Sequence, residues 1–168
     1  MDDRAGFSAF MRDASPGLQR TAWLLTGDWS MAEDLVQTAL IKTWRRWARI
    51  DPAAAHGYVR RVLMTTFLAW RSRKWTGELS TDRLPDGVAG QDAFQQVDLQ
   101  RALVAALLDL PRQQRAVVVL RYYDDLTEAA TASVLGCSVG TVKSHTARAL
   151  NALRAVPGLD PAPDRRRA

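Results

Sequence analysis

Apolar residues recur at intervals of three and four along most of this 168-residue chain. Such spacing places side chains on one face of a helix. Nowhere does a run of β-branched residues alternate with polar ones between turn signals, as a half-buried strand would require. The sequence therefore predicts an all-α fold. The clearest stripe consists of Ala32, Leu35, Val36, Ala39, Leu40, Thr43, Trp44 and Trp47.

Residues that start and stop helices divide the first part of the chain. The Ser-x-x-Glu pattern at Ser30 is typical of a capping box and predicts that the helix of the clearest stripe begins there. A preceding helix over residues 16–26 is predicted to stop at Gly27. Asp51 and Pro52 predict the N-cap and first turn of a third helix. The side chains expected to point inward from this third helix are Val59, Val62, Leu63, Thr66 and Trp70.

Charge is distributed unevenly around a segment that is rich in helix breakers. The formal charge is +5 over residues 1–75, −3 over 76–97 and +3 over 98–168. Because the acidic segment has Gly and Pro residues and no periodicity, it predicts a flexible linker at 76–97. We therefore expect two small helical domains, 1–75 and 98–156, and a disordered tail at 157–168. Two basic blocks favour a polyanionic partner, most often nucleic acid.

Composition argues against several classes of protein. The longest apolar run, 102–108, is too short to cross a bilayer, and the first residues do not resemble a signal peptide, so we expect a cytoplasmic protein without membrane contact. One cysteine and two histidines cannot supply the usual four ligands of a zinc site, and we expect no metal or other cofactor. Neither a nucleophile–base pair nor a glycine-rich phosphate loop is evident, which argues against an enzyme.

The segments 126–135 and 139–155 match a helix-turn-helix. Gly136 suits the turn, while Thr127 and Ser138 suit the two N-caps. On the second helix, one face is apolar and the other has hydrogen-bond donors and no acids, which favours contacts with phosphates and base edges. The alternative is an ordinary solvated helix face. The apolar face has Val142, Thr146, Ala149 and Leu153, and the outer face has Thr141, Ser144, Arg148 and Asn151 with Lys143 beside them.

Aromatic and basic residues alternate in the run from Trp70 to Trp75. A surface that stacks bases while neutralising phosphates requires this combination. The alternative is that the tryptophans are core residues and that the cations complement the C-terminal end of a helix.

Three motifs in order resemble a known family. The stretch Ala32–Gln37 followed by Trp44, the stretch Leu110–Tyr123 and the stretch Leu135–Ser144 are similar to bacterial extracytoplasmic-function RNA polymerase sigma factors, especially an actinobacterial subfamily. The resemblance implies a transcription initiation factor that binds core RNA polymerase and promoter DNA. It makes a cognate anti-sigma factor a plausible partner, and it implies that the linker threads channels of the polymerase.

The resemblance also assigns roles to residues. It implies that residues 1–75 bind core polymerase and open the −10 element, and that residues 98–156 read the −35 element. Helical phase places Ile41 opposite the buried stripe, so we expect it to be exposed in the polymerase-binding face. The expected core-binding residues are Asp34, Gln37 and Ile41. The expected −10 contacts are Thr65, Phe67, Trp70, Arg71, Arg73 and Lys74. The expected −35 contacts are Thr141, Lys143, Ser144, His145 and Arg148.

Some positions depart from the family pattern. Thr65 stands where asparagine is common, and His145 stands where a basic or polar residue is common, so the promoter sequences cannot be carried over from relatives. Ala130 and Thr131 replace the usual Glu-Ile pair, which removes the acid that would complete a capping box with Thr127.

Two other functions fit the same motifs less completely. A stand-alone helix-turn-helix regulator would use the first domain for dimerisation or ligand sensing. A helical adaptor would bind protein only, and its basic blocks would serve solubility.

Overall fold

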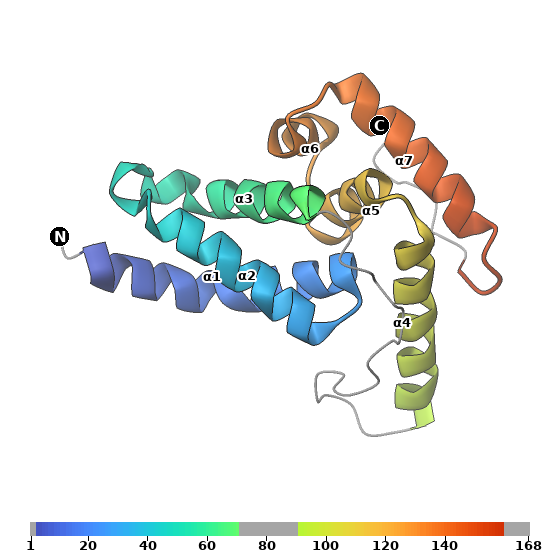
Figure 1. The fold of residues 1–168 in the computed structure, drawn as a ribbon. Coiled ribbons are helices and arrows are strands. Elements are labelled where there is room, and N and C mark those ends of the chain that lie inside the picture. The colour runs from blue at the N-terminus through green and yellow to red at the C-terminus, as the bar shows by residue number, and fades with distance from the viewer. Residues whose placement is uncertain (1–2, 71–90, 160–168) are drawn as a thin grey trace.

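The computed structural model describes residues 3–70 and 91–159, and every regular element in these ranges is a helix (Figure 1). The all-α prediction is confirmed for this part of the chain. The longer helices are α1 (Asp3–Thr26), α2 (Trp29–Trp44), α3 (Ala55–Ala69), α4 (Gln91–Asp109), α5 (Arg112–Val118), α6 (Glu128–Leu135) and α7 (Val139–Arg154). The short 3₁₀ turns are η1 (Trp47–Arg49) and η2 (Pro52–Ala54), and η3 (Val119–Tyr123) is a π-helical turn.

Helix α1 is longer than the sequence predicts, because it continues through Pro16 to Asp3 instead of beginning at residue 16. Proline normally disfavours a helix interior. Here the turns before it are held by aromatic packing that the local pattern does not show. The Phe7 ring lies 5.1 Å from Trp47, and the Phe10 ring lies 5.0 Å from the same indole. Tertiary contacts of this kind outweigh local propensity.

Helix α2 begins at a different cap from the predicted one. Asp28 accepts a hydrogen bond from the Met31 amide at 2.9 Å and is the N-cap, so the expected start at Ser30 is wrong. The predicted stop of α1 is confirmed, since Gly27 has a φ of 71°. The end of the predicted stripe is also wrong, because Trp44 is 41% exposed and Trp47 lies in η1. The stripe members that are buried in α2 are Ala32, Leu35, Val36, Ala39, Leu40 and Thr43.

Helix α3 follows the predicted Asp51–Pro52 signal after one intervening turn. Asp51 accepts from the Ala53 amide at 3.0 Å, and Pro52 opens the 3₁₀ turn η2 before α3 begins at Ala55. Val59, Leu63 and Thr66 are buried as predicted, whereas Val62 and Trp70 are only half-buried. The pattern did not include Met64 and Phe67, which are also fully buried in this helix.

The second region begins earlier than predicted. Helix α4 starts at Gln91, so residues 91–97 of the predicted linker are helical; the linker residues 76–90 and most of the predicted tail lie outside the described ranges. Helix α5 continues directly into the π-helical turn η3. The wider turn is closed by the Asp124 amide, which donates to the Val119 carbonyl at 3.0 Å.

The helix-turn-helix is confirmed in detail. Thr127 caps α6 by accepting from the Ala130 amide at 3.1 Å. Gly136 ends α6 in the left-handed conformation with a φ of 66°, which glycine adopts without a steric penalty. Ser138 then caps α7 by accepting from the Thr141 amide at 3.1 Å.

One hydrophobic core extends across both regions. It joins Leu25 and Leu63 from the first region to Val104, Leu107 and Leu120 from the second. Helix α3 contacts α5 and α6, and α1 contacts α4, α5 and η3 (Figure 1). In this arrangement the two regions therefore pack against each other and are joined by more than the chain between them. Gly27 makes part of this packing possible, since a Cβ there would lie 2.6 Å from a Leu108 methyl carbon.

Candidate nucleic-acid interface

Helix α7 presents the polar face that its sequence predicts. Val142 and Ala149 are fully buried and Thr146 and Leu153 nearly so, which fixes the rotation of the helix against the rest of its region. The opposite face has Lys143, Ser144 and Arg148, all of which are exposed. A helix held by one buried stripe can present its other face to a nucleic-acid groove.

An acidic residue from a neighbouring helix lies close to this face. The Lys143 ammonium is 3.8 Å from a carboxylate oxygen of Glu128, which in turn is 3.9 Å from the Arg121 guanidinium. Because the Lys143 side chain is 64% exposed, its ion pair is weak and a phosphate can replace the carboxylate. The sequence correctly predicts that the outer face of α7 has no acidic residue. It does not show that Glu128 of the neighbouring helix α6 lies close to Lys143, because this contact depends on how the two helices pack.

The remaining two −35 candidates are less accessible. Thr141 is half-buried, and its hydroxyl forms a hydrogen bond with the Ser138 hydroxyl at 2.9 Å, so it also serves the helix cap. His145 is half-buried as well, and its Nδ1 is a buried atom without a hydrogen-bond partner within the described residues. These side chains flank the exposed trio rather than extend it.

The −10 candidates separate into three groups. Thr65 is exposed near the C-terminal end of α3, and its hydroxyl donates to the Arg61 carbonyl at 2.9 Å. Trp70 is half-buried at the C-cap, where its carbonyl accepts from Arg112. The structure thus brings Thr65 and Trp70 to one end of α3. Arg71, Arg73 and Lys74 lie outside the described residues.

Phe67 does not lie on this surface. Its ring is fully buried, with the guanidinium carbons of Arg112 and Arg115 at 5.8 and 5.9 Å from the ring centroid. The expectation that Phe67 contacts −10 DNA does not fit this placement, because the ring is a core residue beneath two cations of the second region.

The predicted polymerase-binding residues share one exposed face of α2. Asp34 and Gln37 are exposed, and Ile41 is 54% exposed, as helical phase predicts. Ile41 borders a shallow hollow of about 340 Å³ that also contains Met11 and Trp44. Both of these side chains are partly exposed, so the apolar patch is wider than Ile41 alone. The sequence missed this extension because Trp44 has the spacing of the buried stripe.

A buried carboxylate links the two regions. Asp124, which follows η3, accepts from the Thr21 hydroxyl at 2.9 Å and from Arg60 Nε at 3.1 Å. Its side chain is only 9% exposed, and burial raises the pKa of its carboxyl, against the opposing effects of Thr21 and Arg60. Its partners belong to α1 and α3, so the bond network crosses from one region to the other.

A buried arginine forms a second link. Arg115 of α5 donates to the Leu25 carbonyl at 2.6 Å, at the end of α1, and to the Leu108 and Leu110 carbonyls at 2.8 and 3.0 Å. Burial lowers the pKa of its guanidinium to about 10, with a further contribution from Arg112. The cation satisfies carbonyls at helix ends that lack partners within their helices. No sequence pattern singled it out.

The described residues contain no group of three or more His, Cys, Asp or Glu side chains that could hold a metal ion. Among the same residues, no helix has the length and apolar character needed to cross a membrane.

Two family models match the chain. The model described as Sigma-70 region 2 matches residues 10–76, and the model described as Sigma-70, region 4 matches residues 100–153. These matches correspond to the two regions of the structure.

Individual proteins are similar over most of the chain. The RNA polymerase sigma-E factor of Streptomyces avermitilis is 40% identical over 150 residues, which cover 88% of this chain and 83% of that protein. The ECF RNA polymerase sigma factor SigL of Mycobacterium tuberculosis is 36% identical, and the match covers 82% of this chain and 80% of that protein. The sigma factor RpoE of Bartonella quintana, solved in complex with the anti-sigma factor NepR, superposes with a TM-score of 0.70 at 26% identity, covering 92% of this chain and 98% of that one.

Proposed function

The chain belongs to the extracytoplasmic-function sigma factors of bacterial RNA polymerase, with actinobacterial relatives, and we propose how its exposed helix faces divide the work of promoter recognition. A sigma factor binds core RNA polymerase and directs it to particular promoters. In this chain α7 reads the −35 element as duplex DNA, and the end of α3 contacts the −10 element. The exposed face of α2 binds core polymerase.

The accessibility of α7 carries the proposal for the −35 element. Its inner face is buried and its outer face has two exposed cations, so the helix can enter a major groove without rearrangement of its own region. Lys143 and Arg148 supply phosphate or base contacts, and Ser144 lies between them. Thr141 and His145 are placed at the flank of this trio.

The −10 contacts are proposed for the C-terminal end of α3 and the residues that follow it. Thr65 and Trp70 are accessible there, wholly or in part. The cations Arg71, Arg73 and Lys74 follow directly in sequence and would neutralise phosphates next to a partly exposed indole. The buried ring of Phe67 lies in the core below this surface and does not contact DNA in this proposal.

Three further proposals concern the cellular setting. We propose that the chain itself catalyses no bond-making step and that it acts in the cytoplasm with the polymerase. Because the similar Bartonella protein was solved with an anti-sigma factor, we propose that a cognate anti-sigma factor restrains this chain too.

The −35 proposal is tested with a double variant, Lys143→Ala with Arg148→Ala, in holoenzyme reconstituted with core polymerase. Binding to a promoter fragment should weaken, and the slope of log affinity against log salt should fall by roughly 0.9 for each phosphate that is no longer neutralised. The matched control is Arg12→Ala with Arg49→Ala, which removes the same charge from exposed positions outside α7. A salt slope equal in both double variants would contradict the role of α7.

The polymerase-binding proposal is tested with Ile41→Glu. A charge within an apolar contact should abolish co-purification with core polymerase, since small interfaces concentrate their binding energy in such anchors. The helical content and thermal unfolding of the free protein should change little, because Ile41 is exposed. Leu99→Glu is the control, as Leu99 is similarly exposed at 53% but lies on α4. Normal binding of core polymerase by Ile41→Glu would contradict the proposal.

A further inference from the structure

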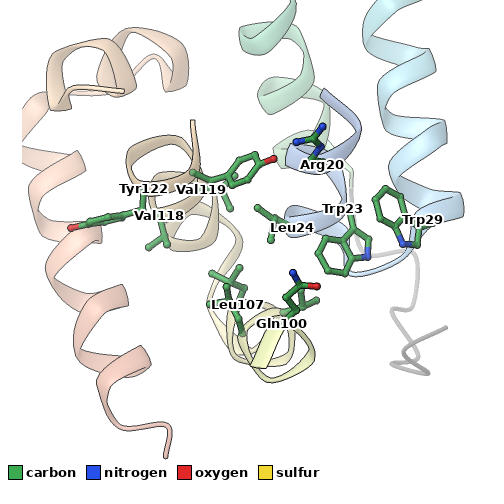
Figure 2. A pocket seen from close by; sticks show the side chains of 12 residues that line it. Arg20, Trp23, Leu24, Trp29, Gln100, Leu107, Val118, Val119 and Tyr122 are labelled. Carbon is green, nitrogen blue, oxygen red and sulfur yellow. The ribbon is translucent and has the colours of Figure 1, made fainter. Parts of the chain in front are cut away.

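A cavity of about 380 Å³ lies between the two regions, away from the three surfaces described above. It is bounded by the end of α1, the start of α2, the middle of α4 and the junction of α5 with η3 (Figure 2). Its volume is in the range of small-molecule binding sites, roughly 300 to 1,000 Å³. The residues that line it are Arg20, Trp23, Leu24, Trp29, Gln100, Leu103, Val104, Leu107, Val118, Val119, Tyr122 and Tyr123.

The walls of this cavity are apolar and largely preformed. Trp23 and Trp29 stack with their ring centroids 5.2 Å apart and their planes at 10° to each other, and they form one flat side (Figure 2). Leu24 and Leu107 are buried side chains at its base. Tyr122 remains 39% exposed although it borders the same space. An apolar body that enters the cavity would therefore displace water from several side chains that the fold leaves incompletely covered.

The charge around the cavity has one sign. Among the described residues that line it, Arg20 is the only charged one, and none carries a carboxylate. Arg20 is exposed, and it forms no salt bridge with any of the described acidic residues. Figure 2 shows its guanidinium at one end of the group of side chains that line the cavity. Guanidinium groups bind carboxylates through paired, charge-assisted hydrogen bonds.

We infer that this cavity binds a small amphipathic carboxylate, whose apolar body lies against the Trp23–Trp29 pair and whose carboxylate meets Arg20. The size of the cavity favours this occupant over a protein segment, since a helix with its side chains is about 10–12 Å across. The ligand would contact α1 and α2 on one side and α4 and α5 on the other. Its binding would therefore stabilise the packed arrangement of the two regions. This inference goes beyond promoter recognition and does not depend on it.

The inference is tested by titrating the full-length protein with saturated fatty carboxylates from hexanoate to dodecanoate, below their micelle concentrations, in a calorimeter. Each added methylene should tighten binding about fourfold until the cavity is filled, after which the affinity should level off. The corresponding primary alcohols should bind about tenfold or more weakly, because they cannot form the charged pair with Arg20. Saturating carboxylate should also raise the midpoint of thermal unfolding.

Two variants identify the site. Arg20→Gln should lower carboxylate affinity to that of the alcohols and leave the alcohols unaffected, whereas Arg12→Gln, on the same helix, should change neither. Leu103→Trp should fill the cavity and abolish binding of both series; Leu103 is 37% exposed, so the larger ring can be accommodated, and thermal unfolding verifies the fold. Affinity that does not depend on chain length, or that is unchanged in Arg20→Gln and Leu103→Trp, would overturn the inference. These titrations contain no polymerase or DNA. Their result therefore neither supports nor contradicts the proposal that α7 and α3 contact the promoter.

Discussion

Helices α7 and α3, which are proposed to contact the two promoter elements, differ in what covers them. Helix α7 buries one stripe within its own region and leaves the opposite face open. Helix α3 packs against α2 on its own side and also against α5 and α6 of the second region (Figure 1). The accessible surface of α7 thus follows from its own periodicity, whereas that of α3 depends on residues far along the chain.

This difference has a functional meaning. In the packed arrangement the outer face of α7, which is proposed for −35 contacts, is exposed, while part of α3, which is proposed for −10 contacts, is covered. Phe67 shows the effect most directly, since its ring is buried beneath Arg112 and Arg115 of α5. If the two regions separate, α3 gains exposed surface and α7 does not. Variants that weaken the contact between the two regions should therefore affect α3 more than α7.

The largest effect is expected from Arg115→Met, which removes the buried cation but keeps an unbranched apolar side chain in place of the arginine stem. Three carbonyls at helix ends would lose their donor, and two of them link α1 to α4. We expect the free energy of unfolding to fall by about 3 kcal/mol in denaturant titrations. Arg101→Met, at an exposed position of α4, should change it by less than about 0.5 kcal/mol. Equal losses in the two variants would show that Arg115 does not hold the regions together.

Asp124→Ala removes the link formed by the buried carboxylate and should destabilise the protein by about 2 kcal/mol at neutral pH. The substitution leaves the Thr21 hydroxyl and the Arg60 guanidinium without their acceptor. Hydrogen exchange should then accelerate in α3 more than in α7, because only α3 depends on the cover from the other region. Asp98→Ala, at an exposed site on α4, is the control. Equal acceleration in both helices would contradict the comparison between them.

Asp124→Asn tests the electrostatic part of the same link. Burial raises the pKa of Asp124 above its unfolded value of 3.8, so its carboxyl favours folding when protonated, and this contribution is lost as pH rises through the folded-state pKa. The amide that replaces the carboxyl does not titrate. The free energy of unfolding of the variant, relative to that of the native protein, should therefore increase as pH rises through that window. If the two proteins differ by the same free energy of unfolding at every pH, the carboxyl of Asp124 does not contribute in this way.

Ala130→Glu should have the smallest effect, an increase of about 0.5–1 kcal/mol in the free energy of unfolding. Thr127 already accepts from the Ala130 amide, so a glutamate at this position can complete the reciprocal capping box. Ala129→Glu adds the same charge one residue earlier, where the reciprocal bond cannot form, and should stabilise less. Since α6 supports α7 and also contacts α3, unchanged stability would show that α6 is already held by its packing.

Much of the second region could be predicted from the sequence because its signals are local. Thr127, Gly136 and Ser138 act on their immediate neighbours, and each has the predicted role. The exposure of Ile41 was also predictable, because it requires only the phase of one helix. For the same reason, the trio of exposed residues on α7 could be identified without a structure.

The contacts between distant segments could not be predicted in this way. Arginine is usually a surface residue, yet Arg115 is buried because α1 and α4 supply carbonyls from two directions. Phe67 was assigned to a DNA-contacting surface, since the sequence does not show that α5 covers it. The early part of α1 was missed because Pro16 is a local stop signal, whereas the aromatic contacts of Phe7 are long-range.

The close approach at Gly27 has a consequence for how this protein can diverge. A methyl group at this position would collide with the Leu108 side chain, and the left-handed backbone adds its own penalty to any other residue. Substitutions at the two positions are therefore coupled, although they lie in different family-matched segments. A descendant that acquires a side chain at position 27 must also turn the Leu108 side chain aside, shorten it or move α4 outward. At this contact, therefore, the two segments do not diverge independently of each other.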